Sequence, residues 1–91
     1  MEKKRTRLQI IRDILEVIKN KSGRIKPTHI LYKSNLSHQM MEEHLAELKE
    51  KGFIRENKEG KSRTYAITQR GQEYLERYKI IEEFTTSFGL G

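Results

Sequence analysis

Apolar residues recur at every third or fourth position along most of the chain, which is the period of helices that bury one face. Leu8, Ile11 and Ile18 show this spacing near the start of the sequence. Beyond residue 70 the same spacing runs through tyrosine, leucine, isoleucine and phenylalanine. The pattern predicts four helices, and their expected ranges are 6–20, 28–33, 37–51 and 68 through at least 84.

Residues that start and stop helices mark the ends of these segments. Thr6, Ser37 and Thr68 each stand at the beginning of one, where a hydroxyl oxygen can accept a hydrogen bond from a free amide of the first turn. Pro27 suits the beginning of the second helix because its φ angle is already helical. Gly52 is expected to end the third helix as a C-cap.

Two short runs, 53–56 and 64–67, have the composition of strands. The polar stretch 57–63 between them contains one glycine and is expected to form the loop of a hairpin. The predicted fold class is therefore mainly α with a small β-hairpin. We expect residues 1–67 to form one domain and residues 68–91 to form a C-terminal helix that extends from it.

The order of the elements is more informative than any one of them. The second and third helices are separated by a tight turn at Ser34 and Asn35, and asparagine tolerates the left-handed conformation that such a turn needs. Two helices joined in this way form a helix-turn-helix, whose second helix is placed to enter the major groove of DNA. A hairpin that follows directly forms a wing. The sequence therefore predicts a winged helix-turn-helix with a short extended piece at 24–26.

Three phrases of the sequence resemble a known family. They are ILYKSNLS at 30–37, LAELKEKGFI at 45–54 and YAITQRGQEYL at 65–75. These phrases are similar to those of archaeal winged-helix DNA-binding proteins, and in particular to the ten-kilodalton chromatin-type group. The resemblance extends over about residues 10–84. It implies a homodimer, joined by an antiparallel coiled coil of the last helix, that binds duplex DNA and catalyses no reaction.

The net charge of +6 favours a polyanionic partner, and its distribution indicates how such a partner would be held. Residues 1–36 carry +7 and residues 52–67 carry +2, whereas the third helix, 37–51, carries −2 and residues 68–91 carry −1. Basic charge thus avoids the helix that would read bases. We expect binding that depends mainly on phosphate contacts, with limited sequence discrimination.

The third helix offers four candidate DNA contacts on its outer face, Ser37, His38, Gln39 and Glu42. Gln39 can pair with adenine and His38 can donate to a base or a phosphate, although both can equally be solvated residues of a first turn. Glu42 can accept a hydrogen bond from cytosine N4, but it repels phosphates. The basic candidates are Arg5 in the N-terminal arm with Lys3 and Lys4, Lys26 before the second helix, and Lys58, Lys61 and Arg63 in the hairpin.

The last helix carries more apolar residues than so small a domain can cover. Tyr74, Tyr78, Ile81 and Phe88 fall near coiled-coil spacing, and Phe84 widens the stripe. An exposed apolar stripe usually marks an interface, so these five residues are expected to join two copies of the chain. The alternative is that the helix folds back across the first helix of its own subunit.

Several kinds of chemistry find no support in the sequence. There is no cysteine, and the three histidines lack the spacing of metal ligands. No nucleophile or acid–base set can be assembled, so we expect neither an enzyme nor a cofactor or small-molecule substrate. No apolar run approaches the length of a membrane span, and the charged N-terminus does not resemble a secretory signal. The expected location is the cytoplasm, in association with the nucleoid.

Two other functions remain open at this point. The acidic third helix favours an adaptor that binds proteins within a transcription complex. RNA binding is a further alternative, but the aromatic residues lie on apolar stripes and not among the surface cations that single-strand stacking needs.

Overall fold

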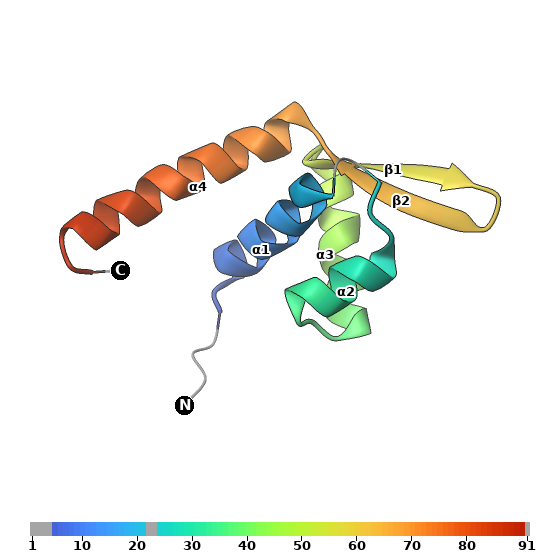
Figure 1. The fold of residues 1–91 in the computed structure, drawn as a ribbon, viewed down its shortest axis with the longest axis horizontal. Coiled ribbons are helices and arrows are strands. Elements are labelled where there is room, and N and C mark those ends of the chain that lie inside the picture. Colours follow the sequence, from blue (N-terminus) through green and yellow to red (C-terminus); the bar gives the residue numbers. More distant parts are fainter. Residues whose placement is uncertain (1–4, 22–23, 91) are drawn as a thin grey trace.

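The computed structural model describes residues 5–21 and 24–90 and confirms the predicted fold class. Four helices and one antiparallel hairpin follow each other along the chain (Figure 1). They are α1 (Arg7–Asn20), α2 (Pro27–Ser34), α3 (His38–Glu50), β1 (Ile54–Glu59), β2 (Ser62–Ile67) and α4 (Gln69–Ser87). Lys3 and Lys4 of the expected basic arm lie outside the described residues.

The core lies where α1, α2, α3 and the base of the hairpin meet. Ile14 and Ile18 of α1 are completely buried there, against Ile30 of α2 and Leu48 of α3. Burial of an aliphatic side chain of this size contributes about 1.5–3 kcal/mol relative to exposure. The apolar residues whose spacing predicted these helices are therefore the residues that pack them together in the core.

The ends of the helices are set by local hydrogen bonds. Thr6 and Gln9 form a capping box at the start of α1, with N···O distances of 3.1 and 2.8 Å. Three residues separate α2 from α3, and Asn35 among them is left-handed at φ 53°. After α3 the amide of Gly52 donates to Lys49 and the amide of Phe53 donates to Leu48, which is a Schellman motif. These caps and the tight turn confirm the sequence predictions.

The hairpin is longer than predicted. The strands were expected at 53–56 and 64–67, but the ladder continues to the pair Glu59 and Ser62, so only two residues form the loop. Gly60, the first of them, has φ 59°, as a two-residue turn of type II′ requires. The expectation of a seven-residue loop was wrong because ladder hydrogen bonds join backbone groups, and polar side chains do not prevent them.

The piece at 24–26 is extended, as predicted, and it also pairs with the hairpin, which the sequence did not indicate. The amide of Tyr65 donates to the carbonyl of Ile25 at 2.9 Å, and the reverse bond measures 3.3 Å. This bridge attaches the segment that leads into α2 to the base of β2. It thereby fixes where the hairpin stands relative to the helix-turn-helix.

Helix α4 begins on the domain and then leaves it (Figure 1). Gly71 is buried at the beginning, and a Cβ atom there would stand 2.4 Å from the carbonyl oxygen of Phe53. One turn later the Tyr74 hydroxyl donates to the carbonyl of Leu8 at 3.0 Å. The C-terminal half of α4 extends beyond the core, and the molecule measures 50 × 31 × 21 Å.

Candidate nucleic-acid interface

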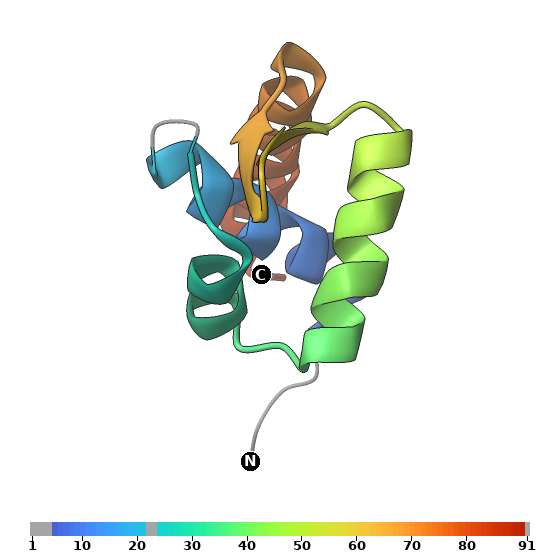
Figure 2. The same ribbon diagram turned by 90° about the vertical axis from the view of Figure 1, so that its right-hand side faces the viewer.

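One side of the molecule presents the helix-turn-helix and the hairpin together. Figure 2 looks at the hairpin from its tip, with α2 and α3 on either side of it and α4 behind. The first turn of α3, beginning after Ser37, is exposed at one edge of this side. The predicted recognition helix and the wing therefore face the same way, while α4 points in another direction.

The residues of α3 that were predicted to contact bases are exposed, and each has a partner within the chain. Ser37 caps α3 through the amide of Met40, at 3.2 Å. Gln39 donates from Nε2 to Glu43 at 3.2 Å, and Nε2 of His38 lies 3.9 Å from a carboxylate oxygen of Glu42. All of these contacts are at the surface, so both side chains can exchange them for a base at little cost.

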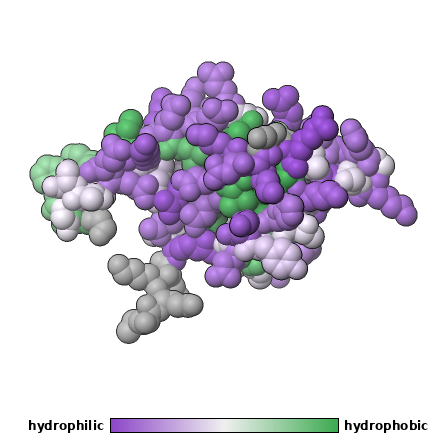
Figure 3. Space-filling model, in the orientation of Figure 1, coloured by the Kyte–Doolittle hydropathy of each residue, from purple (hydrophilic) through white to green (hydrophobic). Residues whose placement is uncertain are grey.

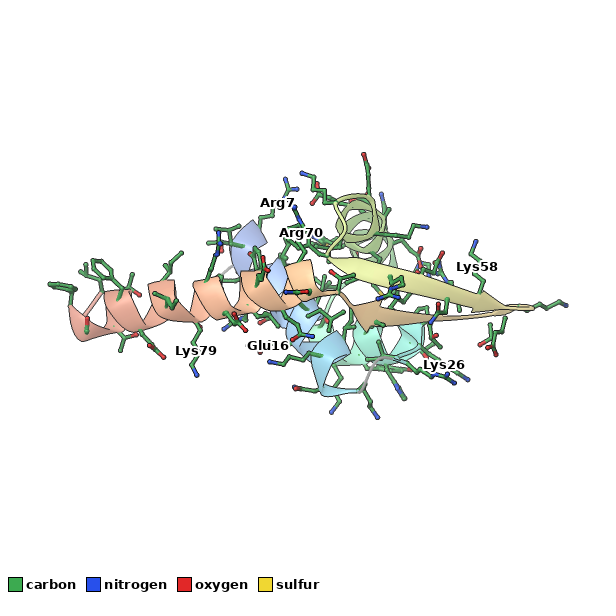
Figure 4. All side chains as sticks on the ribbon, turned by 90° about the horizontal axis from the view of Figure 1, so that it is seen from above. Arg7, Glu16, Lys26, Lys58, Arg70 and Lys79 are labelled. Carbon is green, nitrogen blue, oxygen red and sulfur yellow. The ribbon has the colours of Figure 1, made fainter. Side chains whose placement is uncertain are left out.

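Two candidate cations of the hairpin are exposed. Lys61 lies in the two-residue loop and is exposed, and Lys58 has 72% of its side chain exposed, with Nζ 3.9 Å from Glu56. Lys26 is exposed at the N-cap position of α2. Figure 4 shows Lys26 and Lys58 on the half of the molecule that carries the hairpin and Lys79 on the half formed by α4. Lys26 and Lys58 thus lie on the same half of the molecule as the hairpin, whose two-residue loop contains Lys61.

Arg63, the third of the hairpin cations expected to contact DNA, is engaged within the chain. Its Nη2 forms an ion pair with Oε1 of Glu42 on α3, and its Nη1 lies 3.7 Å from Glu56. The two partners retain 36% and 34% exposure of their side chains. The Glu42 carboxylate raises the pKa of Arg63 further, so the guanidinium stays charged. Two residues predicted to touch DNA separately therefore touch each other.

A nearly buried carboxylate beside this pair was not predicted. Only 10% of the Glu56 side chain is exposed, and it accepts hydrogen bonds from the Tyr65 hydroxyl at 2.8 Å and from Lys49 at 3.2 Å. The hydrogen bond from Tyr65 is the largest cause that lowers the pKa of Glu56, while burial raises the pKa of Tyr65. Glu56 and Tyr65 are cross-strand partners, so the register of the hairpin would have revealed them.

Arg5 is held against the domain. Its guanidinium donates to Asp13 at 2.8 Å and to the backbone carbonyl of Asn35 at 3.1 Å. Asn35 is the left-handed residue of the turn between α2 and α3. Arg5 therefore links α1 to the turn of the helix-turn-helix. These contacts make it less accessible to a phosphate than the sequence suggested.

The five residues expected at a dimer interface divide into two groups. Tyr74 and Tyr78 are half-buried on their own domain and stack with 6.1 Å between ring centroids. Ile81, Phe84 and Phe88 are 61–67% exposed. Figure 3 shows the corresponding apolar surface at the end of α4. Ile80 and Leu90 extend it, at 64% and 76% exposure.

Within 5–21 and 24–90, no three histidine or carboxylate side chains gather closely enough to bind a metal ion. None of the described helices combines the length and the apolar character that crossing a bilayer requires.

Comparison with known proteins agrees with this geometry. The family model described as "Winged helix-turn-helix" matches residues 4–86. No curated protein matches the chain. The fold is similar to Sso10a-2, a DNA-binding protein from Sulfolobus solfataricus, with TM-score 0.75, 21% identity, and coverage of 93% of this chain and 90% of that one.

Two further structures share the fold. AF1382 from Archaeoglobus fulgidus has TM-score 0.71 and 15% identity, over 88% of this chain and 90% of that one. Streptococcus pneumoniae FabT, solved in complex with DNA, has TM-score 0.68 and 15% identity, over 85% of this chain and 55% of that one. The family match and the two archaeal structures confirm the expected resemblance to archaeal winged-helix proteins.

Proposed function

Because the chain belongs to the winged helix-turn-helix family, we propose that it binds double-stranded DNA as a homodimer, without catalysis. Its role would be that of a transcriptional regulator or of a chromatin-type protein, acting in the cytoplasm at the nucleoid. The observation that carries the proposal is the shared orientation of α3 and the hairpin (Figure 2). An exposed first turn and exposed hairpin lysines are the parts that such proteins bring to the major groove and its flanks.

The proposed grip on DNA is mainly electrostatic. Lys26, Lys58 and Lys61 are exposed, whereas α3 carries four glutamates and two lysines between residues 37 and 51. Contacts from these cations to phosphates would release counterions and supply most of the affinity. His38 and Gln39 are the proposed readers of bases, and their small number predicts limited sequence discrimination. The DNA-bound FabT structure supports the general mode, since its fold is similar.

The proposed dimer rests on the exposed apolar end of α4. Ile81, Phe84 and Phe88 would each gain about 1.5–3 kcal/mol from burial, which a second copy can provide. The charge along α4 favours an antiparallel arrangement. Residues 69–79 carry a net charge of +1 and residues 80–90 carry −2, so antiparallel helices place opposite charges together.

A groove between the start of α1 and the first half of α4 supports the same arrangement. It has a volume of about 360 Å³, and its lining residues are Leu8, Phe53, Arg70, Glu73, Tyr74, Arg77, Tyr78 and Ile81. In an antiparallel pair, the partner's Phe84 and Phe88 would approach this apolar floor. The arginines in its lining would approach the partner's acidic half.

The test of DNA binding is a titration of the full chain with a random-sequence duplex and with duplexes selected from a random pool. We expect both to bind, with affinities within about tenfold of each other, and a steep decrease of affinity with salt. A selected site that binds a thousandfold better would instead identify a sequence-specific regulator. Sedimentation over a range of concentrations tests the dimer, whose mass is twice that of the 10.9 kDa chain.

An adaptor that binds proteins is the second candidate, and the acidic α3 is the observation that favours it. Glu43, Glu47 and Glu50 accompany Glu42 on this helix. Such a surface suits a basic protein partner better than a phosphate backbone. Absence of duplex binding even at low salt would favour this function over the first.

A further inference from the structure

The contact between α3 and the hairpin changes the number of cations that DNA can use. Arg63 on β2 and Glu42 on α3 are 21 residues apart in sequence, yet they form an ion pair through Nη2 and Oε1. A hydrogen bond between two charged groups is about twice as strong as a neutral one. Arg63 must leave this carboxylate, or share it, before it can bind a phosphate.

The surroundings of Arg63 keep it in place with or without Glu42. Its Nη1 lies 3.7 Å from the Glu56 carboxylate, and its guanidinium carbon lies 6.0 Å from the centre of the Tyr65 ring. Glu56 is itself held by the Tyr65 hydroxyl and by Lys49. Loss of the Glu42 charge would therefore leave a guanidinium at the junction of α3 and the hairpin whose Nη2 has lost its ionised partner.

The ion pair also reduces the repulsion between two neighbouring cations. Arg63 is the cross-strand partner of Lys58, and like charges on paired positions repel. Glu42 neutralises one of them from the side of α3. His38 is the other basic group near Glu42, at 3.9 Å. At this junction the carboxylates of Glu42 and Glu56 thus balance most of the charge of Lys49, Lys58 and Arg63.

We propose that Glu42 is a specificity-determining residue that withholds Arg63 from the DNA backbone. In the wild-type chain Arg63 makes no phosphate contact, so the sequence-independent part of binding is weaker by one contact than the hairpin charge suggests. An interface with fewer phosphate contacts depends more on the bases that His38 and Gln39 reach. The inference rests on the proposed function, because it concerns the same DNA-binding surface.

The test compares Glu42→Gln with Glu43→Gln in titrations of a random-sequence duplex between 50 and 200 mM salt. Both variants remove one negative charge from neighbouring positions on α3, but Glu43 contacts Gln39 and not Arg63. We expect E42Q to steepen the slope of log affinity against log salt by about 0.9, which is one added phosphate contact. The ratio of the DNA affinity of E42Q to that of wild type should then decrease by about 3.5-fold between 50 and 200 mM salt. E43Q should leave the slope unchanged.

Arg63→Gln provides the second arm. In the wild-type background R63Q should leave the salt slope unchanged, whereas in the E42Q background it should remove the added 0.9. If R63Q alone lowers the slope by about 0.9, Arg63 contacts phosphate in the wild-type protein and the inference is overturned. Equal slopes for E42Q and E43Q would overturn it as well.

The two proposals fail in different ways. A wild-type chain that binds no duplex at low salt contradicts the proposed function and this inference together. A wild-type chain that binds, with an E42Q slope equal to its own, contradicts the inference alone. Far-UV circular dichroism and urea unfolding of each variant show that the change in slope belongs to a folded protein.

Discussion

The two ends of the molecule expose different kinds of side chain, charged at the hairpin and apolar at the end of α4. The hairpin extends from the core with Lys58 and Lys61 in water, and the end of α4 extends from it with Phe84 and Phe88 in water (Figures 1 and 3). Exposed ammonium groups are well hydrated, so the hairpin is complete as a folded element without a partner. Exposed aromatic rings lose the free energy of burial, so the end of α4 gains stability only when something covers it.

The hairpin and the end of α4 suit two different kinds of partner. A cationic projection attracts a polyanion over a distance, and the attraction weakens with salt. An apolar projection attracts nothing at a distance and holds a surface that fits it, with little dependence on salt. This difference is consistent with the two proposed partners, DNA at the hairpin and a second copy of the chain at the end of α4.

The largest effect is expected at the apolar end. Phe84→Asp places a charge where the proposed dimer buries a ring, and the symmetry of a dimer doubles the loss to about 3–6 kcal/mol. Sedimentation should show the dimer dissociation constant raised more than a hundredfold. Thr86→Asp, with the same new charge at another exposed position of α4, is the control. A dimer unaffected by F84D would place the interface elsewhere.

The next largest effect is expected on stability, at Gly71, where the start of α4 packs against the hairpin base. Gly71→Ala puts a Cβ atom 2.4 Å from the carbonyl oxygen of Phe53, and a backbone group cannot move aside cheaply. We expect the free energy of unfolding to decrease by about 1–3 kcal/mol in urea titrations. Gln72→Ala, at the adjacent exposed position, should change it by less than about 0.5 kcal/mol. Equal stability of G71A and wild type would contradict the close packing of α4 on the hairpin base.

The polar junction behind the wing should respond to pH. The hydrogen bond from Tyr65 lowers the pKa of Glu56 in the folded chain below its ordinary value of 4.5. A depressed pKa means that the ionised carboxylate stabilises the fold above pH 4.5 and that this stability is lost as the pH falls through the folded-state pKa. Unfolding in urea at pH 7, 5, 4 and 3 measures the loss.

Substitution identifies the group responsible for that pH dependence. Glu56→Gln should be less stable than wild type at pH 7 by about 1 kcal/mol, and the difference should narrow below pH 4.5. Glu59→Gln, at an exposed position near the tip of the same strand, should follow wild type. A constant difference between E56Q and wild type at every pH would show that ionisation of Glu56 is not the cause.

The smallest effect is expected at the hairpin tip. Lys61→Gln should lower the salt slope of binding to a random duplex by about 0.9 and weaken the affinity severalfold at low salt. It should leave the free energy of unfolding unchanged, because the side chain is exposed in a two-residue loop. Lys79→Gln removes the same charge from α4, far from the hairpin (Figure 4). If both variants lower the slope equally, the hairpin contributes no more to DNA binding than α4 does.

The parts of the fold that sequence predicted well depend on neighbours along the chain. Thr6, Ser37 and Thr68 cap helices through amides only three residues away. The turn at Asn35 and the end of α3 at Gly52 depend on one backbone conformation each. A residue type and its immediate context are sufficient for such features, which is why their positions were predicted to within a residue or two.

The candidate site was predicted less completely because its contacts join distant segments. The sequence indicated Glu42 and Arg63 separately, and only the register of the hairpin against α3 brings them together. Arg5 reaches the carbonyl of a residue 30 positions away. Glu56 and Tyr65 both lie within the predicted strands, but they were missed because the sequence did not set the register that pairs them.

The order of the elements, the ends of the helices and the unequal distribution of charge could be predicted without coordinates, since periodicity, caps and composition act locally. Which charged side chains are engaged and which are exposed depends on the packing of distant segments. This packing pairs Arg63 with Glu42 and holds Arg5 on Asn35, while it leaves Lys58 and Lys61 in water. The reason is that an ion pair depends on the distance between two groups in space, and only the packing of α3 against the hairpin sets that distance.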